Sequence, residues 1–134
     1  MRTEDQTPGV TKLQVLCTIY DSTSINIIGL VHNDSQTPDT IIEKLNITHK
    51  QYSVRISKLL KAGLVKRKSK KYSITSFGKI VYYAYLKIAR AAISFSTLKV
   101  IDTIKLNKNI SHDEYRNVIE YLISDNQLKN ILLH

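Results

Sequence analysis

Apolar residues recur along most of this 134-residue chain at the three- and four-residue spacing of amphipathic helices. Residues 64–74 differ, because two short apolar segments flank a run of cations there, a pattern typical of a β-hairpin. We therefore predict a mainly α-helical fold with one small hairpin. Residues 11–20 fit both the helical and the strand-like spacing, so their structure is left open. The helix that follows them can be capped by Ser22 or Ser24 and ends before a loop at residues 33–36.

Two helices are then predicted on either side of a very short turn. Thr37 can cap the first, with Pro38 at its first position. Asn46 stands where a left-handed residue is needed to turn the chain sharply. Thr48 opens the second helix, and Gln51 completes a capping box with it. This order of elements is a helix-turn-helix arrangement.

The helix expected at residues 48–62 has two different faces. Its apolar side chains should pack on the preceding helices, and these are Tyr52, Ile56, Leu59 and Leu60. The opposite side carries Lys50, Gln51, Val54, Ser57, Lys58 and Lys61. A major-groove helix needs such residues, since Lys can bind guanine, Gln can pair with adenine and Val can touch a thymine methyl. The alternative is an ordinary solvated face, which is the usual role of such residues when nothing else accompanies them.

A basic hairpin follows Gly63, a residue typical of helix ends. Two short strands are expected at residues 64–66 and 72–74. The tip between them is expected to hold Arg67, Lys68, Ser69, Lys70 and Lys71. Four cations at a hairpin tip have no packing role, but they can bind a nucleic-acid backbone or reach a minor groove.

Charge is strongly segregated along the chain. The net charge is +9, and the stretch between Glu43 and Asp102 holds 14 of the 20 Lys and Arg residues but none of the 11 acids. Such segregation is unfavourable unless a polyanion binds. Nucleic acid is favoured over a membrane surface, because no Trp- or Phe-rich amphipathic segment accompanies the charge. A merely solubilising surface usually mixes both signs.

Three groups of residues form a recognisable series: Leu45, Ile47 and Thr48 at the turn, residues 62–65 after the second helix, and Thr75 with Gly78 at the next helix. Over residues 22–78 this series resembles the winged helix-turn-helix core of prokaryotic transcription regulators of the ArsR and MarR kinds, especially small archaeal ones. The resemblance implies base contacts at His49, Lys50, Gln51, Ser53 and Val54. Asn46 departs from the usual turn glycine, and Val54 stands where a polar residue is common. The cysteines of the metal-sensing branch are missing, so a metal sensor is not implied.

A long helix after Thr75 is predicted to form a dimer. Its apolar stripe is Ile80, Tyr83, Ala84, Ile88, Ala91 and Phe95, and Tyr82 and Tyr85 add more aromatic surface than one stripe can bury in a monomer. The expected two-fold interface comprises Ile80, Tyr82, Tyr83, Tyr85, Ile88 and Phe95. The alternative is that the stripe closes on the chain's own C-terminal helices. Residues 94–97 can bend or restart the helix.

Two further helices are expected at the C-terminus. Ser111 with Glu114 can open the first, and Ser124 with Gln127 can open the second. Their apolar positions are Tyr115, Val118, Ile119, Leu122, Leu128, Ile131 and Leu132. They can dock on the dimer helix, extend it or hold a small ligand, and the sequence does not choose among these roles.

No catalytic or metal-binding motif is found in the sequence. The four histidines, His32, His49, His112 and His134, lie in separate elements without paired cysteines, so neither a metal nor a cofactor is expected. The single Cys17 excludes an internal disulfide and suits a reducing cytoplasm. Cations interrupt the apolar run at residues 80–101, so a membrane span is not expected.

These observations predict a non-enzymatic, sequence-specific regulator that binds double-stranded DNA as a homodimer in the cytoplasm. We divide the chain into a polar arm at 1–10, a DNA-binding domain at 11–78 and C-terminal helices at 79–134. The residues expected to contact the DNA backbone are Thr48, Ser57, Lys58 and, in the wing at residues 66–72, Arg67, Lys68, Lys70 and Lys71. The alternatives are a winged-helix module that docks on an acidic protein of the transcription machinery and a non-specific nucleoid or RNA-binding protein.

Overall fold

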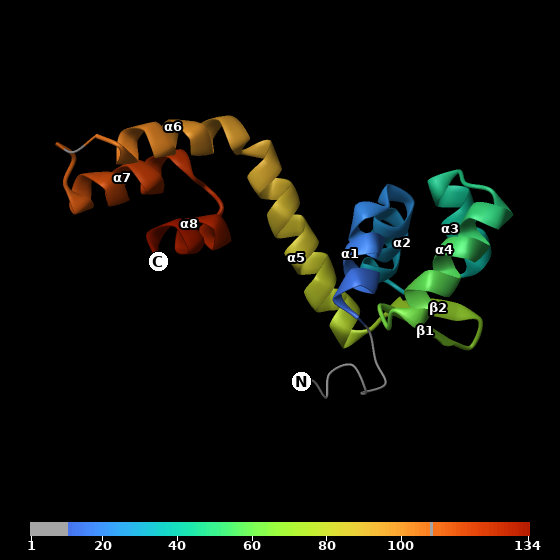
Figure 1. Cartoon of the computed structure of the whole chain (residues 1–134). Coiled ribbons are helices and arrows are strands. Elements are labelled where there is room, and N and C mark those ends of the chain that lie inside the picture. Colours follow the sequence, from blue (N-terminus) through green and yellow to red (C-terminus); the bar gives the residue numbers. More distant parts are fainter. Residues whose placement is uncertain (1–10, 108) are drawn as a thin grey trace. The chain divides into compact units, whose positions relative to one another are not determined.

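The computed structural model describes residues 11–107 and 109–134 (Figure 1), so the arm predicted at residues 1–10 lies outside the described residues. The elements, in chain order, are α1 (Lys12–Tyr20), α2 (Ser22–Asn33), α3 (Pro38–Leu45), α4 (His49–Lys61), β1 (Val65–Lys68), β2 (Lys71–Ile74), α5 (Ser76–Ile93), α6 (Phe95–Lys105), α7 (His112–Leu122) and α8 (Asn126–Leu133). A mainly helical fold with one two-stranded antiparallel sheet is therefore confirmed. The chain forms two compact units that divide after Ala84, within α5, whereas the sequence led us to begin the C-terminal segment at residue 79.

The ambiguous segment before residue 21 is helical. Thr11 and Gln14 cap α1 reciprocally, because each side chain accepts a hydrogen bond from the backbone amide of the other. The predicted cap of α2 is wrong, since the cap is Asp21 and neither Ser22 nor Ser24. The Asp21 carboxylate accepts the Ser24 amide at 3.2 Å and the Ser24 hydroxyl at 2.6 Å, so Ser24 lies inside the first turn as a donor.

The core of the N-terminal unit lies where α2 meets α3, α4 and β2. Its most deeply buried side chains are Ile27, Ile28, Val31, Ile41, Leu59 and Leu64. Tyr52, Ile56 and Leu59 form the buried face of α4, as predicted. Leu60 was also assigned to that face, but its side chain is 38% exposed because it lies about 100° around the helix from Leu59.

The short turn between α3 and α4 is confirmed. Thr37 caps α3 with Pro38 at its start, and Asn46 has the left-handed φ of 52° that the sharp turn requires. Thr48 and Gln51 form the expected capping box at the start of α4.

The hairpin is longer than predicted and its turn is tighter. Cα partners pair from Val65 with Ile74 to Lys68 with Lys71. The turn therefore consists only of Ser69 and Lys70, with φ values of 52° and 67°, instead of the five-residue tip expected from the sequence. Two consecutive residues with positive φ match the twist of paired strands, which explains why the strands extend so far.

A short bridge ties the hairpin to the loop after α2. Gln36 and Tyr72 exchange backbone hydrogen bonds of 2.9 and 2.7 Å. The rings of Tyr72 and Tyr52 meet edge to face, with centroids 6.4 Å apart, so β2 is also packed on α4.

The base of the hairpin is joined to both flanking helices by Thr75. Its hydroxyl donates to the carbonyl oxygen of Gly63 at 2.6 Å and accepts the amide of Gly78 at 2.9 Å. Thr75 is thus the cap of α5, as predicted. Gly63 has a φ of 74°, and a Cβ on Gly78 would collide with the backbone carbonyl of Leu64. Both glycines are therefore required by the backbone geometry.

The apolar stripe predicted for α5 does not lie inside the N-terminal unit. Ile80 and Tyr83 are 69% and 51% exposed, whereas the buried residues of the helix are Gly78 and Val81. The ring of His32 lies between those of Tyr82 and Tyr83, with centroids 5.0 and 5.4 Å away.

The C-terminal unit has its own core. Ile101, Ile119, Ile123 and Leu128 bring α6, α7 and α8 together, and Figure 1 shows α6 and α7 side by side. The expected restart near residue 94 is confirmed, since α5 ends at Ile93 and α6 begins at Phe95.

The two caps predicted for the C-terminal helices have different outcomes. Ser111 and Glu114 form the expected capping box of α7. Ser124 is not the cap of α8, because the Asp125 carboxylate accepts the amides of Gln127 and Leu128.

Replacing Gly78 by Ala tests the junction at Thr75. We expect Gly78→Ala to lower the free energy of unfolding by at least ~2 kcal/mol, because the new methyl group meets a backbone carbonyl that cannot move freely. Gly29→Ala is the control, since its Cβ meets only the end of the Tyr82 side chain, and it should stay within ~1 kcal/mol of wild type. Urea unfolding followed by circular dichroism measures both. Equal effects of the two substitutions would show that the junction is not tight.

Candidate nucleic-acid interface

Every residue that we predicted to contact bases is exposed on α4. His49, Lys50, Gln51, Ser53 and Val54 are exposed, with Val54 at 44%. They are exposed because the apolar side chains of the same helix point into the core. A helix of 13 residues is about 20 Å long, enough to lie along a major groove.

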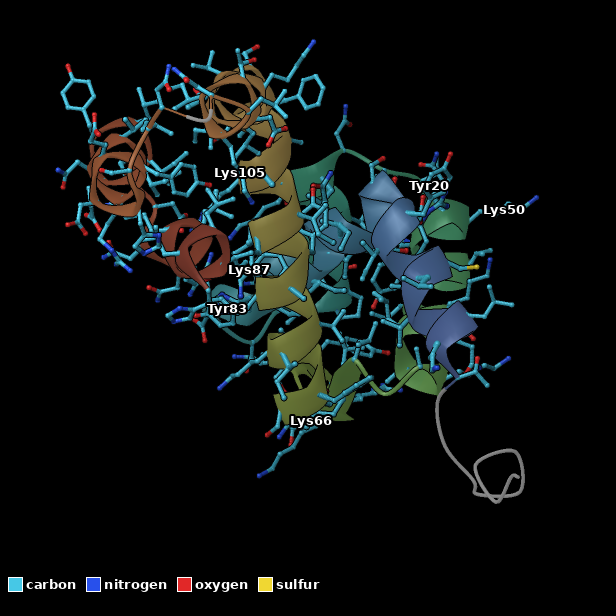
Figure 2. The ribbon with its side chains drawn as sticks, turned by 60° about the vertical axis from the view of Figure 1, so that its left-hand side comes forward. Tyr20, Lys50, Lys66, Tyr83, Lys87 and Lys105 are labelled. Carbon is cyan, nitrogen blue, oxygen red and sulfur yellow. The ribbon has the colours of Figure 1, made fainter. Side chains whose placement is uncertain are left out.

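The residues of α4 that we predicted to contact the DNA backbone are also accessible. Thr48, Ser57 and Lys58 are exposed, as is Lys61 at the end of the helix. The side chain of Lys50 extends away from the ribbon at the start of α4, and that of Lys66 does so from the start of β1 (Figure 2). Cations thus accompany α4 and continue into the hairpin.

Gln51 already has a structural role in the start of α4. Its side-chain oxygen accepts a hydrogen bond from the backbone amide of Thr48 at 2.9 Å, and its backbone amide donates one to the Thr48 hydroxyl at 3.0 Å. A bidentate contact to adenine would need the same oxygen. Base contact by Gln51 would therefore compete with the helix cap.

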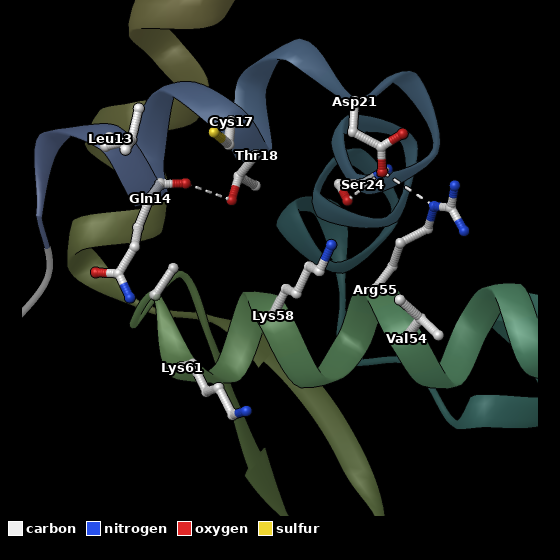
Figure 3. A pocket seen from close by; sticks show the side chains of 11 residues that line it. Leu13, Gln14, Cys17, Thr18, Asp21, Ser24, Val54, Arg55, Lys58 and Lys61 are labelled. Carbon is white, nitrogen blue, oxygen red and sulfur yellow. Dashed lines mark hydrogen bonds and ion pairs between the residues drawn. The ribbon is translucent and has the colours of Figure 1, made fainter.

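Arg55 is the one cation of α4 that is neutralised by an ion pair in the described part of the chain. Its Nε donates to the Asp21 carboxylate at 3.0 Å and so joins α4 to the start of α2 (Figure 3). Partial burial alone would raise the pKa of Asp21, but hydrogen bonds from Ser24 and Arg55 and the charge of Arg55 together hold that pKa below its ordinary value of 3.8. The sequence did not reveal this pair, because the two residues lie 34 positions apart.

The two faces of the hairpin differ sharply in chemistry. One face holds Val65, Tyr72 and Ile74, all buried, with Arg67 over the Tyr72 ring at 6.0 Å. The other face holds Lys66, Lys68 and Lys71. These three side chains are exposed and point to the same side, because alternate residues of a strand share a face.

Two features of the hairpin are unfavourable in the isolated protein. Lys68 and Lys71 are direct cross-strand partners, and like charges in such a pair repel. Lys70 adopts a φ of 67°, a conformation that favours Gly or Asn over a long side chain. Among the ion pairs that the described residues form, none includes a cation of the hairpin. No ion pair within residues 11–107 and 109–134 therefore relieves the repulsion.

The residues predicted for the dimer interface are only partly exposed. Ile80, Tyr83, Ile88 and Phe95 are exposed, whereas Tyr82 and Tyr85 are half-buried. Exposure of apolar residues at helical spacing along α5 leaves a surface that another protein chain can cover.

The described residues were also searched for a metal-binding cluster and for a membrane-spanning helix. Among residues 11–107 and 109–134, no three His, Cys, Asp or Glu side chains gather closely enough to hold a metal ion. In the same ranges no single helix is long and apolar enough to cross a membrane, and only α1 and α2 together, bent by 93°, reach that length and composition.

No protein-family model, no curated protein and no solved structure matches this chain. Only the residues of this chain therefore bear on its function, and the relevant features are the exposed residues of α4, the hairpin lysines and the segregation of charge.

Replacing Asp21 tests the link between α2 and α4. At neutral pH, Asp21→Asn should keep the helix cap but lose the ion pair, at a cost below ~1 kcal/mol because the pair is partly exposed. Asp21→Ala should cost roughly 1 kcal/mol more, because the cap is lost as well. Thermal unfolding at several pH values measures these differences.

The pH dependence of the Asp21 variants has a definite sign. A folded-state pKa below the ordinary value of 3.8 means that the ionised carboxylate stabilises the fold above that pH. The advantage of wild type over Asp21→Asn should therefore disappear as the pH falls through the lowered pKa. A difference that stays constant down to pH ~2 would contradict a role for the charge.

Proposed function

We propose that this chain is a sequence-specific transcription regulator that binds double-stranded DNA through a winged helix-turn-helix domain. In this proposal α3 and α4 are the helix-turn-helix, α4 enters the major groove, and the hairpin of β1 and β2 is the wing. The observation that supports the proposal most strongly is the outer face of the hairpin, where Lys68 and Lys71 oppose each other and form no ion pair with any acid that the structure describes.

The hairpin lysines are explained by a polyanion. Repulsion between Lys68 and Lys71 and the strained φ of Lys70 both disfavour the free hairpin. A phosphate backbone beside the hairpin turns the repulsion into attraction and releases condensed counterions. Flexible cations on the turn and at the adjoining strand ends bind phosphates of any sequence, so the wing supplies affinity and orientation but little sequence preference.

Sequence preference is assigned to α4. Lys50 can bind the acceptor edge of guanine, and Val54 can contact a thymine methyl. His49 and Ser53 are exposed as well, and Thr48, Ser57 and Lys58 are exposed residues that could bind phosphates. The helix cap formed by Gln51 makes its reading of adenine less favourable than the sequence alone indicates, because base contact must displace the Thr48 amide.

A homodimer would place two copies of α4 in successive major grooves of a pseudo-palindromic site. Exposed Ile80 and Tyr83 on α5 support this part of the proposal, as does exposed Ile88 further along the helix. A surface of this composition is suited to a self-complementary two-fold interface. The resemblance to ArsR- and MarR-type regulators, which use such a helix for dimerisation, agrees with this assignment.

Lys70→Gly separates folding from binding. Glycine relieves the positive φ at the turn, so we expect the free energy of unfolding to rise by ~0.5–1 kcal/mol. The same change removes a phosphate contact, so duplex binding should weaken and the slope of log K against log salt should decrease by about 0.9. Fluorescence anisotropy at several salt concentrations and urea unfolding give the two results. A more stable variant with an unchanged slope would remove Lys70 from the interface.

Lys50→Ala serves as a comparison for Lys70→Gly. It also removes one exposed cation, but from the face assigned to bases, so it should change the ranking of duplex sequences in addition to their affinity. Uniform weakening of all duplexes would show that Lys50 contacts only phosphate.

Ile80→Glu tests the dimer. The side chain is 69% exposed, so the substitution should leave the fold of one chain intact but place a charge in the proposed apolar interface. Sedimentation equilibrium should show a dimer for wild type and a weakening of dimerisation by at least tenfold for the variant. Ile131→Glu is the control, since Ile131 on α8 is also exposed, at 58%. Identical behaviour of the two variants would contradict an interface on α5.

A further inference from the structure

The C-terminal unit exposes a narrow stripe of side chains along α6. Phe95 and Leu106 are 61% and 81% exposed at the two ends of the helix, and the exposed Lys99 and Asp102 lie between them. Their spacing of four, three and four residues places all four side chains within about 60° around the helix axis. Ile101, on another side of α6, is buried in the core of the same unit. These four exposed residues, called the α6 stripe below, are therefore accessible to a partner.

The α6 stripe is separate from the apolar stripe of α5. We grouped Phe95 with the α5 stripe by helical spacing, but the helix breaks at Ser94, whose side chain forms no cap hydrogen bond. Figure 1 shows that α6 continues in a different direction from α5. Phe95 therefore belongs to a second exposed surface.

The spacing and the charges of the α6 stripe restrict the partner that can cover it. Side chains spaced four, three and four residues apart are the contact positions of a helix that packs along a second helix. Lys99 and Asp102 form no ion pair among the described residues, although the Lys99 ammonium lies 5.6 Å from the centroid of the Phe95 ring. An apolar partner helix would bury both charges without a counterion, which is costly. The partner must therefore carry an acid and a base at the matching positions.

A second copy of α6 in the antiparallel orientation meets this requirement. A two-fold axis through the middle of the helix sets Phe95 opposite Leu106 of the second copy, and Lys99 opposite Asp102 of the second copy. Each contact occurs twice because of the symmetry. A parallel pair would instead set Lys99 against Lys99 and Asp102 against Asp102, and like charges repel. The α6 stripe is thus complementary to itself in one orientation only.

From this complementarity we propose that α6 pairs with α6 of a second copy of the chain in an antiparallel, two-fold contact. The contact extends for only ~16 Å along the helix, so it is weak by itself and depends on the concentration of the protein. If the chain also dimerises through α5, the α6 contact joins two dimers into a tetramer. Such a tetramer would hold two duplex sites at once, and only this consequence rests on the proposed function.

Sedimentation equilibrium of the full chain without DNA, over a range of concentrations, tests the contact. Lys99→Glu places an acid opposite Asp102 in both halves of the pair, so both attractive contacts become repulsive. We expect association through α6 to weaken at least ~tenfold. The double variant of Lys99→Glu and Asp102→Lys restores opposite charges and should associate within about threefold of wild type. Arg116→Glu on α7 reverses an exposed cation outside the α6 stripe and should have no effect.

The Ile80→Glu variant separates this contact from the proposed dimer on α5. Its α5 surface carries a charge, so the variant should form dimers through α6 alone, and adding Lys99→Glu should leave monomers. A wild-type chain whose entire association is removed by Lys99→Glu would support the α6 contact and contradict the dimer on α5.

The salt dependence of association gives a second readout. Salt screens attraction and repulsion alike, so rising salt should weaken association of wild type through α6 and strengthen that of Lys99→Glu. Three results would overturn the antiparallel contact: equal losses in Lys99→Glu and Arg116→Glu, a double variant as weak as Lys99→Glu, or an association that does not respond to salt.

Discussion

The hydroxyl group of Thr75 makes the connection on which the arrangement of the N-terminal unit depends. By donating to Gly63 and accepting from Gly78, it joins the end of α4, the base of the hairpin and the start of α5 within one short network. The close approach of Gly78 to the Leu64 backbone leaves little room for these elements to shift. Because this network holds α4 and the hairpin relative to each other, their exposed cations keep a fixed spacing, which suits a rigid partner such as duplex DNA.

The distribution of charge follows from the same packing. The core takes the apolar side chains of α2, α3 and α4, so the cations of residues 44–79 must lie outside, where no acid of that stretch accompanies them. Asp21 neutralises Arg55 from the start of α2, whereas the hairpin lysines have no ion pair among the described residues. A protein that only needed solubility would gain nothing from placing Lys68 opposite Lys71. The arrangement is favourable when a polyanion is bound, and this is the physical basis of the proposed function.

Much of the local structure could be predicted from the sequence because its causes are local. Thr37 with Pro38, Asn46 and the capping boxes at Thr48 and Ser111 involve groups within a few residues, and all were confirmed. The caps at Asp21 and Asp125 were missed because a serine beside each aspartate can play the same part. Periodicity identified a stripe on α5 whose Ile80 is exposed, but it did not identify Val81 as the apolar residue of that helix that is buried. The Arg55–Asp21 pair arises from a contact between distant segments, which a sequence pattern does not contain.

The proposed binding of duplex DNA by α4 and the hairpin, with a preference for sequence, can be tested by selecting bound duplexes from a random-sequence pool at physiological salt and sequencing them. We expect enrichment of an inverted repeat whose half-sites lie about one helical turn apart, bound at least ~10³-fold more tightly than random duplex. Binding without enrichment would contradict sequence recognition and indicate a nucleoid or RNA-coating protein. No binding at all would assign the cationic surface to an acidic protein partner.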